Sequence, residues 1–250
     1  MPRKPRDKSP THLYHVTLRG NGKQLIFEDD EDRLVFLDTV TRSFAANNIT
    51  LIAWCLMGNH VHLAIYDPND GLSASMQSIT TSYAMKFNKK TGHSGHVFQD
   101  RFGTSPILSE EHLYQAIKYI HLNPEKAGIA EAASYFWSSN RQYQGIEDEY
   151  CCVDSNIVDQ LFSNPQRYLR FMSQERSTYR PQSAGRRSEK EAIELAAAIA
   201  KEVAGVSLDE VKAQPKPLRN RVLSKMREQS IPIRQIQRFT GIGEWTIRKA

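Results

Sequence analysis

Two apolar runs separated by only two residues constrain the fold of this chain more than any other feature of the sequence. The runs are ITLIAWCLM (49–57) and HVHLAIY (60–66), and both are rich in the β-branched and aromatic residues typical of strands. Gly58 and Asn59 lie between them and are of the types that form a tight two-residue turn. The sequence therefore predicts an antiparallel β-hairpin, and any fold of this region must contain it.

The segments around the hairpin predict a βαββαβ order. They are a strand-like run, HLYHVTL (12–18), two amphipathic helices at 29–47 and 71–90, and GHVFQDRFGTSPIL (95–108), a loop followed by a short strand. Together with the hairpin they give an α+β, ferredoxin-like arrangement with an antiparallel sheet. A third helix should begin after Ser109, a favourable N-cap residue, run to Asn123 and stop at Pro124.

The rest of the chain predicts a linker and a second, all-helical domain. We expect residues 135–179 to be irregular, and STYRPQSAGRRS (177–188) to be a linker because Pro, Gly, Ser and Arg dominate it. Beyond it, EKEAIELAAAIAKEVA and PLRNRVLSKMREQ are strongly helical, and IPIRQIQRFTGIGEWTIRKA fits a helix-turn-helix whose second helix is Glu244 to Ala250. The predicted domains are a basic tail (1–10), the α+β domain (11–145), an irregular extension and linker (146–188) and the helical domain (189–250).

Charge is unevenly distributed along the chain. The net charge is +5 over 250 residues, but residues 176–250 carry +8 and residues 1–175 carry −3. A basic C-terminal region indicates a polyanionic partner, most often nucleic acid, although a solvated helical surface has the same composition. The apolar runs are too short for us to expect a membrane-spanning helix. The three cysteines indicate neither a disulfide framework nor a zinc site, so the expected location is the reducing cytoplasm.

His60 and His62 stand one residue apart on the second strand of the hairpin, so their side chains should point to the same face. Two imidazoles about 6–7 Å apart along a strand can converge on one divalent metal ion. An isolated pair is more often two ordinary hydrogen-bonded histidines at a hairpin edge. A metal site therefore needs a third ligand or a nucleophile from elsewhere in the chain.

The segment KYIHLNPEKAG (118–128) supplies candidates for both. Tyr119 and Asn123 are four residues apart in a predicted helix, so they lie on one face of it. Tyr119 brings a phenol, and Asn123 brings an amide oxygen able to bind a hard cation. If this helix packs across the sheet face that bears the histidines, the ligands and the phenol meet at one point. Tyr119 could equally be a core aromatic residue, and Tyr114 is a competing phenol one face away.

Four motifs together resemble the HUH single-tyrosine transposases, and more closely their REP-associated tyrosine transposase branch. The motifs are GNHVHL, SGHVFQDRF, YIHLNPEKAG and FWSSNRQYQG, and the N-terminal YHVTLRGNGKQLIFEDDEDRLVF resembles the opening of the family. The resemblance covers about residues 10–145. The order and spacing of four separate motifs make it far more specific than two histidines alone.

The resemblance implies roles for four residues. His60 and His62 match the metal-binding pair, Tyr119 matches the nucleophile, and Asn123 matches the third ligand, where related transposases commonly have glutamine. The implied activity is site-specific cleavage and joining of single-stranded, hairpin-containing DNA through a 5′-phosphotyrosine intermediate. The implied cofactor is Mg²⁺ or Mn²⁺, which would polarise a phosphate oxygen. The protein would act in the bacterial cytoplasm or nucleoid, as a monomer or a homodimer.

The candidate DNA contacts are basic or polar side chains near the predicted site and in the C-terminal helices. They are Arg19, Lys86, Lys89, Lys90, Gln99, Arg101, Arg234, Arg238, Arg248 and Lys249. Phe98 and Tyr83 could stack on bases, as in other single-strand binders. For each residue a solvated surface charge or a core position is an equally reasonable interpretation. The expected partners are single-stranded hairpin DNA and, through the C-terminal helices, duplex DNA.

Two other classes of function compete with this one. A DNA-binding regulator derived from a transposase would keep the fold and the helix-turn-helix without any chemistry. It would not need Tyr119 aligned with His60 and His62, so the intact set favours the enzyme. A metal-dependent hydrolase that uses the histidine pair with water is a third alternative, and it leaves Tyr119 unexplained.

Overall fold

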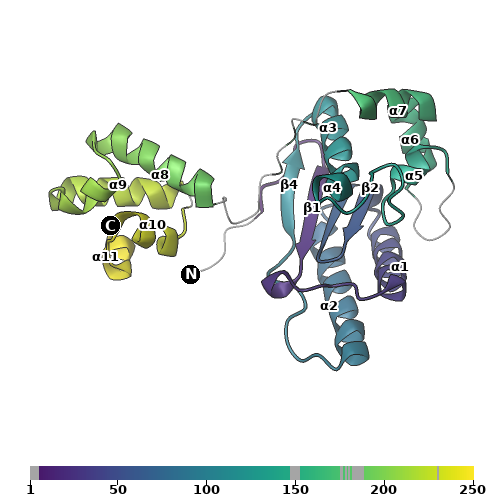
Figure 1. Cartoon of the computed structure of the whole chain (residues 1–250), viewed down its shortest axis with the longest axis horizontal. Helices are drawn as coiled ribbons and strands as arrows, with labels where there is room; N and C mark the ends of the chain where they lie inside the picture. The colour runs from purple at the N-terminus through teal and green to yellow at the C-terminus, as the bar shows by residue number, and fades with distance from the viewer. Residues whose placement is uncertain are drawn as a thin grey trace. The chain divides into compact units, whose positions relative to one another are not determined.

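A four-stranded antiparallel sheet is the centre of the first of the two units into which the chain divides, Met1–Ala184 and Gly185–Ala250 (Figure 1). The structure is a computed structural model, and it describes residues 6–146, 153–174, 177, 179, 181, 189–229 and 231–250. The strands are β1 (Leu13–Arg19), β2 (Thr50–Met57), β3 (His60–Tyr66) and β4 (Gly103–Ile107), in the order β2-β3-β1-β4.

The helices of the first unit cover both faces of this sheet. They are α1 (Asp30–Ala46), α2 (Leu72–Thr91), α3 (Glu110–His121), α4 (Asn123–Lys126), α5 (Asn140–Tyr143), α6 (Ser155–Phe162) and α7 (Pro165–Ser173), with a 3-10 turn η1 (Asn21–Lys23). In Figure 1, α1 and α2 pack together on the side of the sheet away from α3 and α4. The order β1-α1-β2-β3-α2-β4 is the predicted one, and the α+β class with an antiparallel sheet is confirmed.

The antiparallel hairpin forms with the predicted two-residue turn. Met57 pairs with His60 across Gly58 and Asn59, and β3 also pairs with β1, where Arg19 lies opposite His60. Residues opposite each other in an antiparallel pair share a face, and so do residues two apart on one strand. His15 and Arg19 of β1 therefore lie on the same face of the sheet as both histidines of the hairpin.

The third predicted helix was expected to run to Asn123 and to be ended by Pro124, and both parts of this prediction were wrong. Helix α3 ends at His121, and Leu122 leads into the short helix α4, in whose first turn Pro124 lies. Proline is tolerated there because the first-turn N–H groups have no intrahelical acceptor. The predicted start is correct, since the hydroxyl of Ser109 accepts a hydrogen bond from the backbone N–H of His112.

The segment expected to be irregular, residues 135–179, contains helices α5, α6 and α7 in its described part, which corrects that expectation. The helices are short, but Phe162 and Tyr168 are buried against the first unit's core. The linker predicted at 177–188 falls largely outside the described residues. Residues up to Ser173 therefore extend the first unit, and they do so as packed helices.

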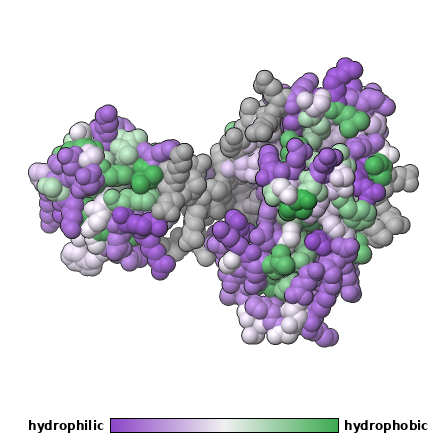
Figure 2. Space-filling view, viewed as in Figure 1, coloured by the Kyte–Doolittle hydropathy of each residue, from purple (hydrophilic) through white to green (hydrophobic). Residues whose placement is uncertain are grey.

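The second unit is helical and has a core of its own. Its elements are α8 (Glu189–Ala204), the 3-10 turn η2 (Asp209–Ala213), α9 (Lys216–Glu228), α10 (Ile233–Thr240) and α11 (Glu244–Lys249). Val222, Leu223 and Ile236 are fully buried in that core. The helical C-terminal region is thus confirmed, and η2 was not expected. The face of each unit drawn in Figure 2 is mostly hydrophilic, and no helix in the described part of the chain could cross a membrane.

Candidate active site

Three histidines form a cluster on the sheet face that α3 covers. The ring centroids of His60 and His62 lie 5.0 Å apart, and those of His15 and His62 lie 5.1 Å apart. His15 Nε2 is 2.9 Å from His62 Nδ1, which is hydrogen-bond distance. His15 and His62 are buried and His60 is half-buried, so the cluster reaches solvent through His60.

Helix α3 brings Tyr119 to this cluster. The Tyr119 ring centroid lies 5.8 Å from those of both His62 and His15. The side chain is half-buried, held between the histidines and Lys126, whose Nζ lies 4.0 Å from the ring centroid. The phenol thus lies beside two imidazoles and beneath a cation, as a nucleophile facing an anionic substrate would require.

Asn123 is connected to the cluster through the main chain of Tyr119. Its amide nitrogen donates to the carbonyl of Tyr119 at 2.8 Å and to that of Ile120 at 3.5 Å. These bonds fix the orientation of the amide, so its oxygen is the atom left to serve as a ligand. The residue is 8% exposed, which suits a ligand at the edge of a partly enclosed site.

The cluster favours neutral histidines. Burial lowers the pKa of His60 to about 4, with a smaller contribution from the positive charge of Arg19. Burial also lowers the pKa of His15 to about 3 and that of His62 well below its usual value, the latter with help from His15, His60 and Lys126. Neutral imidazoles keep a lone pair, which is the form that binds metal ions.

Three further residues at this cluster were missed in the sequence, namely His15, Lys126 and Tyr179. The Tyr179 hydroxyl is 3.1 Å from His15 Nδ1, and its ring centroid lies 5.5 Å from that of Tyr119. Burial raises the pKa of Tyr179. The alternation of side chains along β1 could have indicated His15. Lys126 follows Tyr119 by seven residues, and this spacing could have indicated Lys126. Tyr179 carried no local signal, because it is 164 residues from its partner His15.

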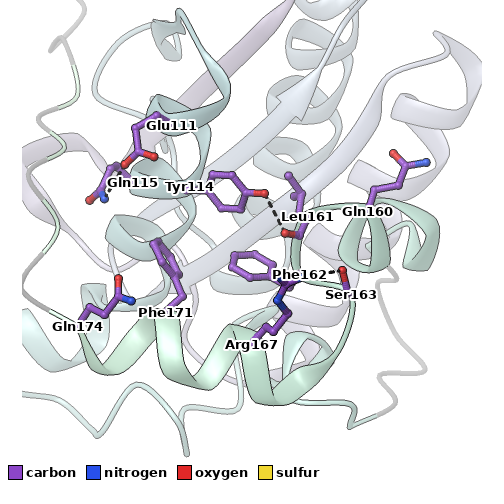
Figure 3. Close-up of a pocket in the computed structure, with 10 residues that line it drawn as sticks. All are labelled: Glu111, Tyr114, Gln115, Gln160, Leu161, Phe162, Ser163, Arg167, Phe171 and Gln174. Carbon is purple, nitrogen blue, oxygen red and sulfur yellow. Dashed lines mark hydrogen bonds between the residues drawn. The ribbon is translucent and has the colours of Figure 1, made fainter.

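Tyr114, the competing phenol, faces a different part of the structure. Its hydroxyl donates to the carbonyl of Leu161 at 2.8 Å (Figure 3). The carboxylate of Glu110 lies 3.2 Å from the same hydroxyl. A cleft of about 460 Å³ opens there between α3 and the α6–α7 segment. It is lined by Glu111, Tyr114, Gln115, Gln160, Leu161, Phe162, Ser163, Arg167, Phe171 and Gln174, and so by none of the clustered histidines. Tyr114 therefore lies outside the candidate active site.

The candidate DNA contacts of the first unit differ in their surroundings. Arg19 is exposed opposite His60, and the backbone N–H of Gln99 donates to the Arg19 carbonyl, so both border the cluster. Arg101 is also exposed, as are Lys86 and Lys89 on α2. Lys90 forms ion pairs with Asp29 at 2.6 Å and Asp32 at 2.8 Å, which a phosphate would have to displace.

The two proposed base-stacking aromatics belong to the core or its edge. Tyr83 is 1% exposed, and its hydroxyl donates to the Ile26 carbonyl, so it is a core residue. Phe98 is half-buried and packs on Tyr83, with ring centroids 6.1 Å apart. The structure thus contradicts base stacking by Tyr83.

In the second unit, the four basic candidates are exposed on α10 and α11. They are Arg234, Arg238, Arg248 and Lys249. Arg248 pairs with Glu244 at 2.6 Å, and Lys249 Nζ lies 4.2 Å from the ring centroid of Trp245. Trp245 is 69% exposed, which is uncommon for so large an apolar side chain.

The antiparallel sheet thus presents His60 and His62 to Tyr119 on the covering helix α3. Residues 8–123 match the family model described as "Transposase IS200 like". One solved structure, a REP-associated tyrosine transposase bound to a REP hairpin, is similar at 15% identity and a TM-score of 0.48. That match covers 73% of this chain and 100% of the other. No curated protein matches the chain.

The matched segment contains His15, His60, His62, Tyr119 and Asn123. Lys126 and Tyr179 lie beyond it. Among the described residues, no group of three His, Cys, Asp or Glu side chains is arranged to hold a metal ion. The ligand set expected from the sequence is of another kind, two imidazoles and one amide oxygen.

Proposed function

We propose that the protein is a site-specific single-strand DNA endonuclease and strand transferase, a transposase, with Tyr119 as the nucleophile. The observation that carries the proposal is the Tyr119 ring beside His62, with centroids 5.8 Å apart, inside the segment that matches the IS200-like transposase family model. The ferredoxin-like order of the sheet, β2-β3-β1-β4, supports it because it aligns the histidine pair with the helix that carries the tyrosine.

The residues present fit a divalent metal, as such transposases generally require. His60 Nδ1 lies 2.7 Å from the amide oxygen of Asn59, and His62 Nδ1 lies 2.9 Å from His15. The Nε2 atoms of His60 and His62, with the amide oxygen of Asn123, are the donors that remain for Mg²⁺ or Mn²⁺. When bound, the metal would polarise a phosphate oxygen and stabilise the charge of the transition state.

The covalent step conserves the energy of the broken phosphodiester. Tyr119 Oη loses its proton and bonds to phosphorus, while the bond from phosphorus to the 3′ oxygen breaks and that oxygen takes up a proton. The products are a 5′-phosphotyrosine and a free 3′-hydroxyl. A 3′-hydroxyl from another DNA end then attacks the same phosphorus, which releases the Tyr119 phenol and joins the strands.

Lys126 and Arg19 supply positive charge at the two edges of the cluster. Lys126 lies over the Tyr119 ring, and Arg19 is opposite His60 on the neighbouring strand. Both side chains are exposed, so a phosphate on the DNA backbone can reach them. They would hold the scissile phosphate against Tyr119 and offset its charge.

The proposed substrate is single-stranded DNA next to a hairpin, which the resemblance of four sequence motifs supports. The second unit would bind the duplex stem or flanking duplex through α10 and α11, as a helix-turn-helix whose basic residues contact phosphates. Gly241 has φ of 63° between these helices, which suits the tight turn of that motif.

The test is cleavage of end-labelled hairpin DNA with Mn²⁺, analysed on a denaturing gel. With a label at the 5′ end, the proposed enzyme gives a shortened labelled strand. With a label at the 3′ end, it gives a labelled protein band that survives SDS and disappears with protease. Tyr119→Phe should abolish both while hairpin binding stays within about twofold, and Tyr114→Phe should behave as the unmodified protein. Binding without any cleavage, across several hairpins and both metals, would instead support the non-catalytic regulator.

A further inference from the structure

We infer that His15 and Asn59 are positioning residues that fix the tautomers of the two histidine ligands. Each accepts a hydrogen bond from Nδ1 of one ligand, so that Nε2 of that ligand carries the lone pair. This inference rests on the proposed function, in which His60 and His62 hold a metal ion. Neither role was expected from the sequence, where Asn59 was only a turn residue and His15 part of a strand.

For His60 the hydrogen bonds leave one solution. The Asn59 amide nitrogen donates to the Lys23 carbonyl at 3.1 Å, which turns its amide oxygen toward His60 Nδ1, 2.7 Å away. An amide oxygen can only accept, so His60 Nδ1 must carry the proton. A neutral imidazole has one N–H, and His60 Nε2 is therefore the atom with the lone pair.

For His62 the same result depends on a chain of two hydrogen bonds. His62 Nδ1 and His15 Nε2 are 2.9 Å apart, and His15 Nδ1 is 3.1 Å from the Tyr179 hydroxyl. If His62 donates to His15, then His15 donates from Nδ1 to the Tyr179 hydroxyl, so each neutral imidazole of the chain has one donating and one accepting nitrogen.

Because the chain of hydrogen bonds is buried, the loss of any one partner is costly. His15 is 0% exposed and His62 is 7% exposed, so water cannot replace a lost partner at little cost. The opposite arrangement, with His15 donating to His62, would place a proton on His62 Nε2 and remove a metal ligand. Removal of the hydrogen-bond acceptor behind a metal-binding histidine typically changes metal affinity 10–100-fold.

The protein offers a matched control in His121. Its two ring nitrogens are each 2.8 Å from a hydroxyl, Tyr168 at Nδ1 and Ser139 at Nε2. It is 0% exposed, as His15 is. Loss of either imidazole should therefore destabilise the fold comparably, but only His15 contacts a proposed ligand.

The first experiment measures Mn²⁺ affinity of the full chain by electron paramagnetic resonance, without DNA. We expect His15→Leu to weaken binding about 10–100-fold. His15→Gln should stay within about fivefold, because its amide oxygen can accept from His62 Nδ1. His121→Leu should lower the melting temperature as much as His15→Leu and leave affinity unchanged. Equal affinities for all four proteins, or equal losses in both leucine variants, would overturn the inference.

The second experiment needs no variant, and so does not depend on one that folds. Nitrogen-15 NMR of histidine-labelled, metal-free protein near neutral pH reports which ring nitrogen carries the proton. We expect Nδ1–H for both His60 and His62, and Nε2–H in either would overturn its half of the inference. Both experiments are independent of cleavage. If the protein cleaves no DNA but gives these results, only the proposed function is refuted. If it cleaves DNA but its Mn²⁺ affinity does not change in His15→Leu, only the inference is refuted.

Discussion

Removal of the Lys126 charge should slow cleavage without preventing it. Lys126 Nζ lies 4.0 Å from the Tyr119 ring centroid, so its charge is close to the phenol that carries the reacting oxygen. At about 5 Å a unit charge pair is worth about 3 kcal/mol at an effective dielectric constant near 20, and under about 1 kcal/mol in water. Because Lys126 is exposed, we expect its charge to stabilise the transition state by an energy in the middle of this range, about 1–2 kcal/mol.

That energy corresponds to a loss of about 5- to 30-fold in rate for Lys126→Met. The assay is single-turnover cleavage of labelled hairpin DNA at saturating protein, which separates the chemical step from binding. Lys126→Arg should recover most of the rate. Lys8→Met removes an equally exposed charge, one that pairs with Asp70 instead, and should have no effect. A Lys126→Met protein that cleaves at the unmodified rate would refute the role of Lys126.

Other perturbations follow from the packing, the charges and the division into two units. Burial lowers the pKa of His121 to about 3 from an ordinary 6.5, so its contribution to stability is complete above pH 6.5 and is lost as the pH falls toward 3. The melting temperature should therefore fall between pH 7 and 5, and less so in His121→Leu; identical slopes would contradict this. Lys118 is 2% exposed and donates to the carbonyls of Phe171 and Gln174, so Lys118→Met should cost about 1–3 kcal/mol in denaturant unfolding. Deletion of residues 185–250 should leave the first unit folded but weaken DNA binding and flatten its dependence on salt, since fewer phosphate contacts release fewer counterions. An unchanged salt slope would exclude the second unit from DNA binding.

The hairpin could be read from the sequence because its determinants are local. Two apolar runs and a Gly58–Asn59 turn specify the strand spans and the partner together, and strand β3 begins and ends where predicted. Because side chains two apart on a strand share a face, His60 and His62 could be placed on one face. Helix α3 was predicted as well, because its N-cap at Ser109 is also a local signal.

The rest of the site depends on contacts between distant parts of the chain. His15 joins the cluster only because β1 pairs with β3, and Tyr179 arrives from 164 residues away. The helices of residues 155–173 are too short to give a clear periodic pattern. They form because Phe162 and Tyr168 bury themselves against α3, and Tyr168 hydrogen-bonds His121 there. Tertiary packing of this kind overrides weak local preference.

Peptide mapping by mass spectrometry is the most direct test of the claim that Tyr119 is the nucleophile. The protein is incubated with single-stranded hairpin DNA and Mn²⁺, treated with nuclease and digested with trypsin. Cleavage after Lys118 separates Tyr114 from Tyr119, which falls in the peptide YIHLNPEK, and Tyr179 falls in a third peptide. The account predicts a nucleotide phosphate on the Tyr119 peptide and on neither of the others. A nucleotide on the Tyr114 or Tyr179 peptide, or on no peptide while the DNA is cleaved, would contradict it.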